Sequence, residues 1–402
     1  MTIRAFKGSF TQQERLPEAA HLAAKAVLEG GRLHRYGTAP HEVAQAAALE
    51  AEFAKWQGAG FCLALTSGGQ AIQIALRAVG VSPEEPVLTN AFTLAPVPGA
   101  IAAVGAKAVL VESAENLTID LTDLEEKARS SKARVLLLSH MRGHIADMDA
   151  ILEICERYGV KIVEDCAHTM GARFDGERSG SHGLVSCFST QTYKHINSGE
   201  GGLLTTNNPE IAARATMLSG SYMNYSRHGA GPSATAFETA RYETPNMSAR
   251  MDNLRASILT PQLERLDANV ARWNERHSVL VEALEGVRGV ALPVQHPKTL
   301  RVGSSFQFRL PDADTAMCQS VVDRAGSLGV ELKWFGAAEP VGFTSNHKSW
   351  RYLASQSLPK TDEILSTLFD MRVPLTFSLE DCAHIGRILQ HVLENTVVLD
   401  PA

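Results

Sequence analysis

The chain has 402 residues, of which 45% are hydrophobic and 20% are charged, and its formal net charge is −6. This length predicts two or three domains with a large core and excludes small disulfide scaffolds and lone binding modules. A weakly acidic chain without a basic tract offers no field that attracts nucleic acid or an anionic membrane surface. We therefore expect a folded enzyme with no nucleic-acid or membrane partner.

The cysteines and the hydropathy pattern predict a cytoplasmic protein. Six cysteines are scattered without a CxxC pair, mostly in apolar runs, which indicates reduced core residues. The N-terminal sequence MTIRAFKGSF lacks the apolar stretch of a signal peptide. The least polar segment, residues 92–111, is interrupted by prolines, glycines and a lysine, so we expect no membrane span.

Residues 60–206 alternate short aliphatic runs with helical patterns, which is typical of an α/β domain with a mostly parallel sheet wrapped by helices. The predicted strands are residues 61–66, 107–111, 134–139, 160–165, 184–189 and 202–206. Helices are predicted at residues 70–79 and 147–158. Residues 201–244 turn polar and glycine-bearing, which indicates a long mobile loop.

The C-terminal third predicts a second, smaller α+β domain. A helix over residues 251–274 leads into it. Strands are expected at residues 287–292, 304–310 and 329–334, and helices at 313–328 and 379–394. We predict an N-terminal arm and large domain over residues 1–269, and a small domain over residues 270–402.

The stretch from 163 to 206 carries the chemistry. Asp165 ends a predicted buried strand, where open α/β sheets place their ligands, and Lys194 lies in a loop rich in Ser, Thr and Gly. A carboxylate can pair with a protonated ring nitrogen, and a desolvated lysine can lose its proton and attack a carbonyl. Pyridoxal 5′-phosphate (PLP) needs these two protein groups.

These residues resemble the DegT/DnrJ/EryC1/StrS family of PLP-dependent sugar aminotransferases. Asp165 and Lys194 are 29 positions apart, and Phe188-Ser189 and the Gly-Glu-Gly-Gly turn at 199–202 fall in register with the family. The upstream sequence SHMRGHIADMDAI is similar to the family's His-x-x-Gly-x-x-Ala-Asp-Met-Asp pattern. The resemblance implies fold type I, with a large PLP-binding domain and a small C-terminal domain.

The resemblance also implies roles for single residues. Lys194 would form the Schiff base with PLP and then shuttle a proton, and Asp165 would hold the ring nitrogen protonated. His168 would lie beside the ring, where a histidine is similar to the 3-amino-5-hydroxybenzoate synthase branch. Ser189 would bind the cofactor phosphate, and Leu94 stands where relatives often stack an aromatic ring on the cofactor.

A strand-to-helix turn offers the phosphate its backbone donors. Ser67, Gly68 and Gly69 precede a predicted helix, whose N-terminus favours an anion and whose glycines permit close approach. Downstream, PNMSARMDNL is similar to a family segment whose asparagine reaches the phosphate in the neighbouring subunit. Because two residues are extra here, either Asn246 or Ser248 could make that contact. The resemblance therefore implies a homodimer with shared active sites, and a tetramer is an open alternative.

Candidates for substrate contact are aromatic and basic residues in three places. They lie in the sequence GRLHRYG, in the polar segment at 201–244, and beside Lys194. A guanidinium suits a carboxylate or a phosphate. The candidates are Arg32, Arg35, Tyr36, Tyr193, Tyr222, Tyr225 and Arg227.

The predicted function is a PLP-dependent aminotransferase that cycles through pyridoxamine 5′-phosphate. Glutamate or glutamine would donate the amino group to a keto group on a sugar, cyclitol or related polar ring. The same lysine could instead serve a lyase, dehydratase or racemase, and a non-enzymatic PLP-binding regulator is a further alternative. His140 and His144 stand four residues apart, but a turn between them and the lack of a third ligand argue against a metal site, so we expect no metal.

Overall fold

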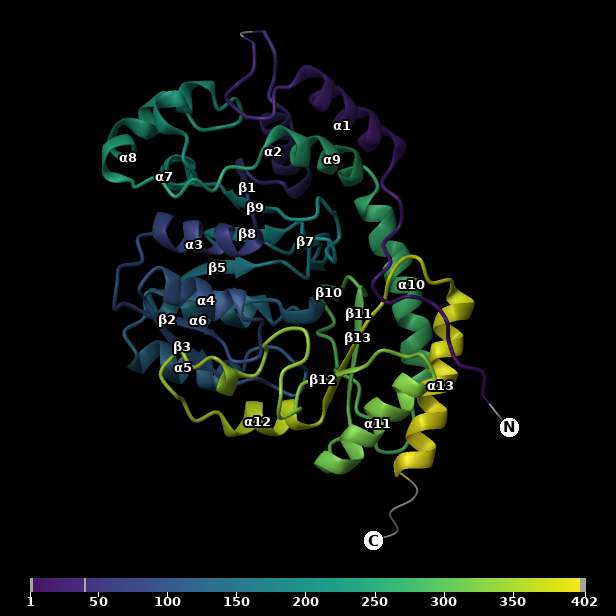
Figure 1. The fold of residues 1–402 in the computed structure, drawn as a ribbon. Coiled ribbons are helices and arrows are strands. Elements are labelled where there is room, and N and C mark those ends of the chain that lie inside the picture. The colour runs from purple at the N-terminus through teal and green to yellow at the C-terminus, as the bar shows by residue number, and fades with distance from the viewer. Residues whose placement is uncertain (1–2, 40, 398–402) are drawn as a thin grey trace.

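The computed structural model describes residues 3–39 and 41–397 and contains a large α/β part beside a smaller α+β part (Figure 1). A seven-stranded sheet in the order β1-β9-β8-β5-β4-β2-β3 forms the centre of the large part. Its strands are β1 (Phe61–Leu65), β2 (Pro86–Asn90), β3 (Lys107–Val111), β4 (Val135–Ser139), β5 (Lys161–Asp165), β8 (Val185–Ser189) and β9 (Gly202–Thr206). Neighbours from β3 to β8 run parallel, and β9 is antiparallel to both β8 and β1.

Helices cover both faces of this sheet because successive strand residues point to opposite sides. Along β4, Leu136 and Leu138 pack in one buried cluster, and Val135 and Leu137 pack in the other. The helices of the large part are α1 (Glu18–Gly30), α2 (Gln45–Gln57), α3 (Gly68–Ala78), α4 (Pro96–Ala103), α5 (Leu121–Ser130), α6 (Met148–Tyr158), α7 (Pro209–Ser219), α8 (Phe237–Glu243) and α9 (Asn253–Leu263).

Helix α6 shows how local sequence sets these boundaries. Asp147 caps its first turn by accepting a hydrogen bond from the Ala150 N–H group, and Gly159 ends it in the left-handed conformation, with φ of 66°. The predicted helix is therefore confirmed. Its buried face carries Met148, Ile151, Ile154 and Cys155, and Leu152 is exposed.

The small part is built on a second sheet. Its strands are β11 (Ser305–Arg309), β12 (Lys333–Trp334) and β13 (Leu368–Arg372), and its helices are α10 (Leu266–Leu284), α11 (Thr315–Ser327), α12 (Pro359–Ser366) and α13 (Leu379–Val397). The N-terminal segment descends beside α10 (Figure 1), and Phe6 and Phe10 pack in the core of this part. The division at residue 269 stays a prediction.

Short strands β6 (Arg173–Phe174), β7 (Glu177–Arg178) and β10 (Thr299–Leu300) form a third sheet. Four 3₁₀ turns complete the described elements: Met141–Gly143, Tyr222–Arg227, Ala234–Ala236 and His347–Ser349. No helix in the described part of the chain combines the length and apolarity needed to cross a bilayer.

Four predicted elements were wrong. The expected loop at 201–244 contains α7 and α8, because Asn208 caps α7 and Pro209 suits its first turn. The helix expected at 251–274 divides into α9, which contains Pro261, and α10. The strand expected at 287–292 is a single bridge from Ala291 to Arg309, and the strand at 329–334 shortens to β12. Strand β2 went unpredicted, since it begins at a proline.

A buried ion pair joins the loop after α1 to α2. Arg35 donates two hydrogen bonds to the Glu50 carboxylate, at 2.6 and 2.8 Å, and both side chains are fully buried. The ring of His228 lies 3.2 Å from the same carboxylate. Burial raises the pKa of Glu50, but Arg35 and His228 oppose this more strongly and bring it to about 2. Glu50 is therefore ionised and fixes two distant segments together.

The variant Glu50→Gln should lower the free energy of unfolding by about 3 kcal/mol at neutral pH, because Arg35 would remain buried without its counter-charge. The Glu50 contribution is present above the ordinary pKa of 4.5 and is lost as the pH falls toward 2. The difference between variant and wild type in denaturant titrations should therefore shrink below pH 4.5. The matched control, Glu42→Gln, removes an exposed pair with Arg32 that solvent screens, and it should change stability far less than Glu50→Gln does. Equal effects of the two variants would contradict this account.

Candidate active site

Asp165 is a buried carboxylate at the carboxyl end of β5. Its Oδ2 accepts a hydrogen bond from the Ser139 hydroxyl at 3.0 Å, and its Oδ1 accepts one from the Ala167 N–H group at 3.2 Å. Burial raises the pKa of Asp165, and these two donors oppose the rise. Among the described residues no basic side chain lies within ion-pair distance of this carboxylate. The sheet thus presents a buried carboxyl group that lacks a cationic partner.

Lys194 lies in the loop between β8 and β9, where its N–H group donates to the Gln191 carbonyl at 2.8 Å. Burial and then the positive charge of Arg142 lower the pKa of Lys194 to about 7, and Arg372 adds to the effect. Asp165 opposes it. A large fraction of this amine is therefore unprotonated at neutral pH and can attack a carbonyl carbon.

The turn before α3 lies directly against the end of β8. The Ser67 hydroxyl caps α3 by accepting from the Gln70 N–H group at 3.1 Å. A Cβ atom at Gly68 would lie 2.9 Å from the Ser189 Cβ, and one at Gly202 would lie 2.3 Å from the Ser67 carbonyl oxygen. These glycines are therefore required for the close approach. The N–H groups at the start of α3 are free of helical partners and suit a phosphate.

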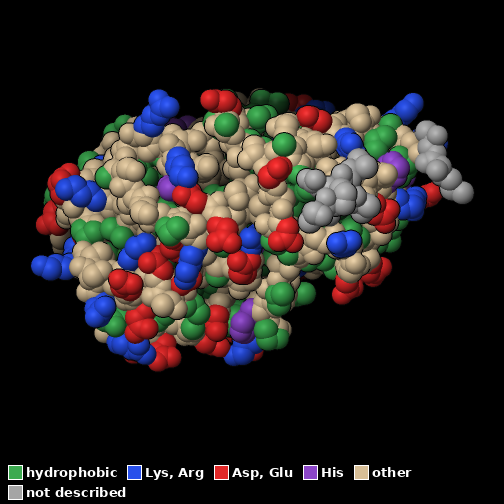
Figure 2. All heavy atoms as spheres, turned by 90° about the horizontal axis from the view of Figure 1, so that it is seen from below, with side chains coloured by type: hydrophobic (Ala, Val, Ile, Leu, Met, Phe, Trp, Pro, Cys, Tyr) green, Lys and Arg blue, Asp and Glu red, His purple; other side chains and the backbone are tan. Residues whose placement is uncertain are grey.

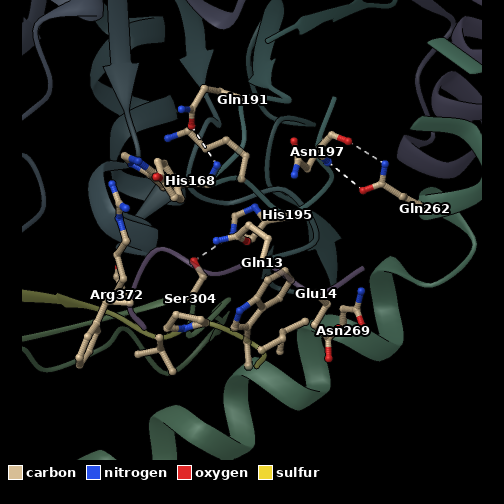
Figure 3. Close-up of a pocket in the computed structure, with 18 of the residues that line it drawn as sticks. Gln13, Glu14, His168, Gln191, His195, Asn197, Gln262, Asn269, Ser304 and Arg372 are labelled. Atoms are coloured by element: carbon tan, nitrogen blue, oxygen red, sulfur yellow. Dashed lines mark hydrogen bonds between the residues drawn. The ribbon is translucent and has the colours of Figure 1, made fainter. Parts of the chain in front are cut away.

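A cavity of about 500 Å³ opens between the two parts of the chain (Figure 3). The sequence-predicted residues Leu94, His168, Tyr193 and Lys194 line it. Phe10 and residues 13–17 of the N-terminal segment form another wall, and Glu14 of this segment pairs with Arg272 of α10 at 2.6 Å. The cavity is therefore built from the large part, the small part and the N-terminal segment together.

His168 is a neutral member of this wall. Burial and the nearby Lys194 charge hold its pKa well below the usual range for histidine. Its Nδ1 accepts a hydrogen bond from the Arg142 N–H group at 3.2 Å, which fixes the direction of the ring. In Figure 3 the imidazole lies near Gln191 and Arg372 at one end of the cavity.

Two arginines at the cavity were missed by sequence reasoning. Arg142 has a side chain only 8% exposed, and it pairs with Asp370 of the small part at 2.7 Å. Its guanidinium also lies 5.1 Å from the centre of the Phe343 ring. Arg372, at the end of β13, lies 3.7 Å from the centre of the Tyr193 ring. A basic residue at a turn after a predicted strand was the one available signal, and it applied to Arg142 only.

His195 and Ser304 form a further unpredicted pair in the cavity. The His195 Nε2 lies 3.0 Å from the Ser304 hydroxyl, as Figure 3 shows. Burial and then the charge of Lys194 lower the pKa of His195 to about 3, so this ring is neutral. Nearby, the Gln262 side chain bonds the backbone of Asn197 through both its oxygen and its nitrogen.

The remaining predicted substrate residues lie elsewhere in this chain. Arg32 pairs with Glu42 at 2.6 Å, and Arg227 donates to the Thr38 carbonyl. Tyr36 is buried, and its hydroxyl lies 3.0 Å from the His228 Nδ1. Arg35 is occupied by Glu50, and neither Tyr222 nor Tyr225 lines the cavity. None of these residues reaches the cavity of its own chain.

The two candidates for the phosphate contact between subunits, Asn246 and Ser248, are both exposed and hydrogen-bond each other. The Asn246 side-chain oxygen accepts from the Ser248 N–H group at 2.8 Å. Neither residue lines the cavity of the same chain. The contact of one of them with a cofactor in the neighbouring subunit stays a prediction.

The two histidines weighed as metal ligands point to different partners. His140 lies 3.0 Å from the Glu164 carboxylate, whereas His144 lies 2.8 Å from the Gln307 side-chain oxygen. The turn expected between them is present as the 3₁₀ segment Met141–Gly143. His140, Glu164 and Cys166 approach one another, but Glu164 already accepts hydrogen bonds from the backbone N–H groups of residues 180, 182 and 183.

The donor set fits PLP. The buried Asp165 lacks a cation, which a protonated ring nitrogen would supply. The Lys194 amine has the lowered pKa that condensation with an aldehyde requires. The α3 N-terminus has no room for a side chain at Gly68 and offers backbone donors for the phosphate.

Several curated relatives of the chain are named as transaminases or aminotransferases. It is 36% identical over 274 residues to the dTDP-3-amino-3,4,6-trideoxy-alpha-D-glucose transaminase of Streptomyces venezuelae, covering 66% of this chain and 67% of that one. It is 31% identical to the 3-amino-5-hydroxybenzoate synthase of Amycolatopsis mediterranei, covering 70% and 71%. These relatives support transamination and not the lyase or racemase alternative.

Solved structures agree in fold. The 3-amino-5-hydroxybenzoic acid synthase structure has a TM-score of 0.81 at 25% identity and covers 98% of this chain and 100% of its own. The DesV structure of S. venezuelae has a TM-score of 0.77 at 27% identity and covers 93% and 94%. The model of the DegT/DnrJ/EryC1/StrS aminotransferase family matches residues 17–390. The chain belongs to this family and is a PLP-dependent aminotransferase.

Proposed function

We propose that the chain transfers an amino group from glutamate or glutamine to a keto group on a sugar, cyclitol or related polar ring. The observation that carries the proposal is the placement of Lys194, with its pKa of about 7, on a cavity beside the buried Asp165 carboxylate. A relative named L-glutamine:scyllo-inosose aminotransferase, from Streptomyces griseus, is 31% identical and supports the choice of donor and of a ring acceptor. A cavity of about 500 Å³ has room for such a ring.

The chain's own residues divide the work. When bound, PLP supplies an electron-withdrawing ring that stabilises negative charge on the substrate carbon. Lys194 takes a proton from the substrate carbon and later returns one, which a pKa near neutrality permits in both directions. Asp165 would hold positive charge on the ring nitrogen, and the α3 N-terminus and Ser189 would bind the phosphate. His168 stays neutral on the wall of the cavity.

Arg142 and Arg372 supply positive charge on the wall that faces Lys194. Both arginines line the same cavity as Lys194, and their positive charges lower the pKa of its amine. A carboxylate of the amino donor suits two guanidinium groups in such a place. We assign these arginines to the carboxylate of the amino donor.

The function is tested by separating the two halves of the reaction. Glutamate or glutamine alone should convert the bound cofactor to pyridoxamine 5′-phosphate, as measured by absorbance and mass spectrometry. A panel of ketosugars and keto-cyclitols should then return it to PLP with formation of an amino product. If no amino acid generates pyridoxamine 5′-phosphate, the proposal fails.

The proposed assembly is a homodimer in which each cofactor site takes residues from both chains, and a tetramer made of two such dimers is compatible with it. Asn246 and Ser248 are exposed and lie away from the cavity of their own chain, which supports a contact with a neighbouring site. We also propose a cytoplasmic location. All six cysteines are unpaired and buried, which suits a reducing compartment.

The variant Lys194→Ala should lower kcat at least about 10³-fold, because both the amine that binds the cofactor and the proton carrier are lost. Borohydride should fix the cofactor to the peptide that contains Lys194 in the wild type and leave no adduct in the variant. Lys55→Ala, which changes an exposed lysine of α2, is the control and should behave as wild type. An adduct on another lysine would refute the assignment.

The rate at which PLP enters the apoprotein should rise with pH through about 7, because the unprotonated amine is the nucleophile. An ordinary lysine would give a rise through its usual value of 10.5. Arg372→Gln should move the midpoint upward by removing a positive charge that disfavours the protonated amine. Arg265→Gln, at an exposed position of the cavity, is the control and should leave the midpoint in place. A wild-type midpoint near 10 would contradict the prediction.

A hybrid dimer tests whether the sites are shared. One chain would carry Lys194→Ala and the other Asn246→Ala, with different affinity tags for purification of the hybrid. If Asn246 serves the neighbouring site, one of two sites is intact, so the hybrid should recover about half of the wild-type kcat while each parent stays low. Ser248→Ala in place of Asn246→Ala distinguishes the two candidates. A hybrid as inactive as both parents would place the contact within one chain.

A further inference from the structure

The hydroxyl groups of Thr93 and Ser139 form a chain of two hydrogen bonds that ends at Asp165. The Thr93 hydroxyl donates to the Ser139 hydroxyl oxygen at 2.8 Å, and the Ser139 hydroxyl donates to the Asp165 Oδ2 at 3.0 Å. All three side chains are buried, with Thr93 fully so. They come from three different segments: the loop after β2, the end of β4 and the end of β5.

The direction of these hydrogen bonds follows from the chemistry of the groups. A hydroxyl carries a single proton, and an ionised carboxylate can only accept. Because the Ser139 oxygen accepts a hydrogen bond from the Thr93 hydroxyl, the Ser139 O–H group can donate its own hydrogen bond to Asp165. A hydrogen bond to an ionised group is stronger than one between neutral groups, and it favours the ionised form.

The backbone holds Ser139 beside Asp165. Strands β4 and β5 are parallel, and Ser139 and Asp165 are direct partners in their register. The Ser139 N–H group donates to the Asn90 side-chain oxygen at 2.9 Å, which anchors the end of β4 to β2. A change of rotamer at Ser139 would leave the Thr93 hydroxyl without its acceptor and the Asp165 Oδ2 without its donor, and both groups are buried.

We propose that Ser139, oriented by Thr93, is a positioning residue that holds Asp165 ionised and aligned for the ring nitrogen of PLP. The inference rests on the role of Asp165 in the proposed function. Ser139 would act on the cofactor only through Asp165, whose Oδ2 it contacts. Asp165 without this donor would be a buried carboxylate with one fewer stabilising contact, and it would favour its protonated form.

The test measures the cofactor rather than turnover. Holoenzyme would be prepared with PLP labelled with ¹⁵N in the ring, and the ring-nitrogen resonance and the dissociation constant of PLP would be compared among variants. Ser139→Ala should move the resonance toward the unprotonated position and weaken PLP binding by roughly tenfold, in line with the loss of a hydrogen bond to a charged group. Ser139→Thr, which keeps the hydroxyl, should restore both values.

Thr93→Val provides a second, milder variant that preserves volume, and it should shift both values in the same direction as Ser139→Ala. Its matched control is Thr89→Val on the neighbouring β2, because the Thr89 hydroxyl is also fully buried but has no hydrogen-bond partner. The control should leave the resonance and the PLP dissociation constant unchanged. If it moves them as far as Thr93→Val does, the effect is one of general packing and the inference is wrong.

Asp165→Asn separates this inference from the proposed function. If Asp165→Asn moves the resonance but Ser139→Ala and Thr93→Val leave it as in wild type, Asp165 keeps its role and the inference about Ser139 is overturned. If Asp165→Asn itself has no effect, the assigned role of Asp165 fails and the inference fails with it. Unfolding curves of each apoprotein would identify any variant that does not fold, in which case the other hydroxyl variant decides.

Discussion

The architecture of the site depends on a buried carboxylate that has hydrogen-bond donors but no cation. Leaving an ionised group inside a protein is expensive unless it is paired or hydrogen-bonded. Asp165 receives one donor from Ser139 and one from the backbone of residue 167, and no guanidinium or ammonium group of the described chain pairs with it. A ligand that brings its own positive charge therefore completes this site, and the parallel sheet brings the donors to one edge.

The second constraint is that three parts of the chain must meet around one cavity. Arg142 of the large part pairs with Asp370 of the small part, and Glu14 of the N-terminal segment pairs with Arg272 of α10. These contacts span long distances in sequence, so the cavity exists only when the whole chain has folded. The face shown in Figure 2 carries interspersed acidic and basic side chains without a continuous basic stripe. Inside the molecule, Arg142 and Arg372 place positive charge on the wall of the cavity.

The sequence correctly predicted those elements whose pattern lies within a few consecutive residues. The strands that end at Ser139 and Asp165, the capped helix after Asp147 and the lysine loop each carry their pattern within a few residues, and the structure has them at those places. Strand β2 was not predicted because a proline at its first position is typical of a loop. Helix α7 was not predicted because the polar and glycine-containing residues around it indicated a loop. Arg372 could not be placed, since its approach to Tyr193 depends on how β13 packs against a loop about 180 residues earlier in the chain.

The charges around Lys194 resolve a conflict between two requirements of the chemistry. Asp165 has to be anionic to hold a protonated ring nitrogen, but an anion near a lysine favours the protonated amine, which is not a nucleophile. Burial alone would lower the pKa of Lys194, but it would also raise that of Asp165 and so work against the first requirement. Different neighbours act on the Lys194 amine and on the Asp165 carboxylate. The arginines from two parts of the chain disfavour the charged amine, and the neutral hydroxyl donors behind the sheet favour the charged carboxylate without adding a cation that would compete with the ring nitrogen.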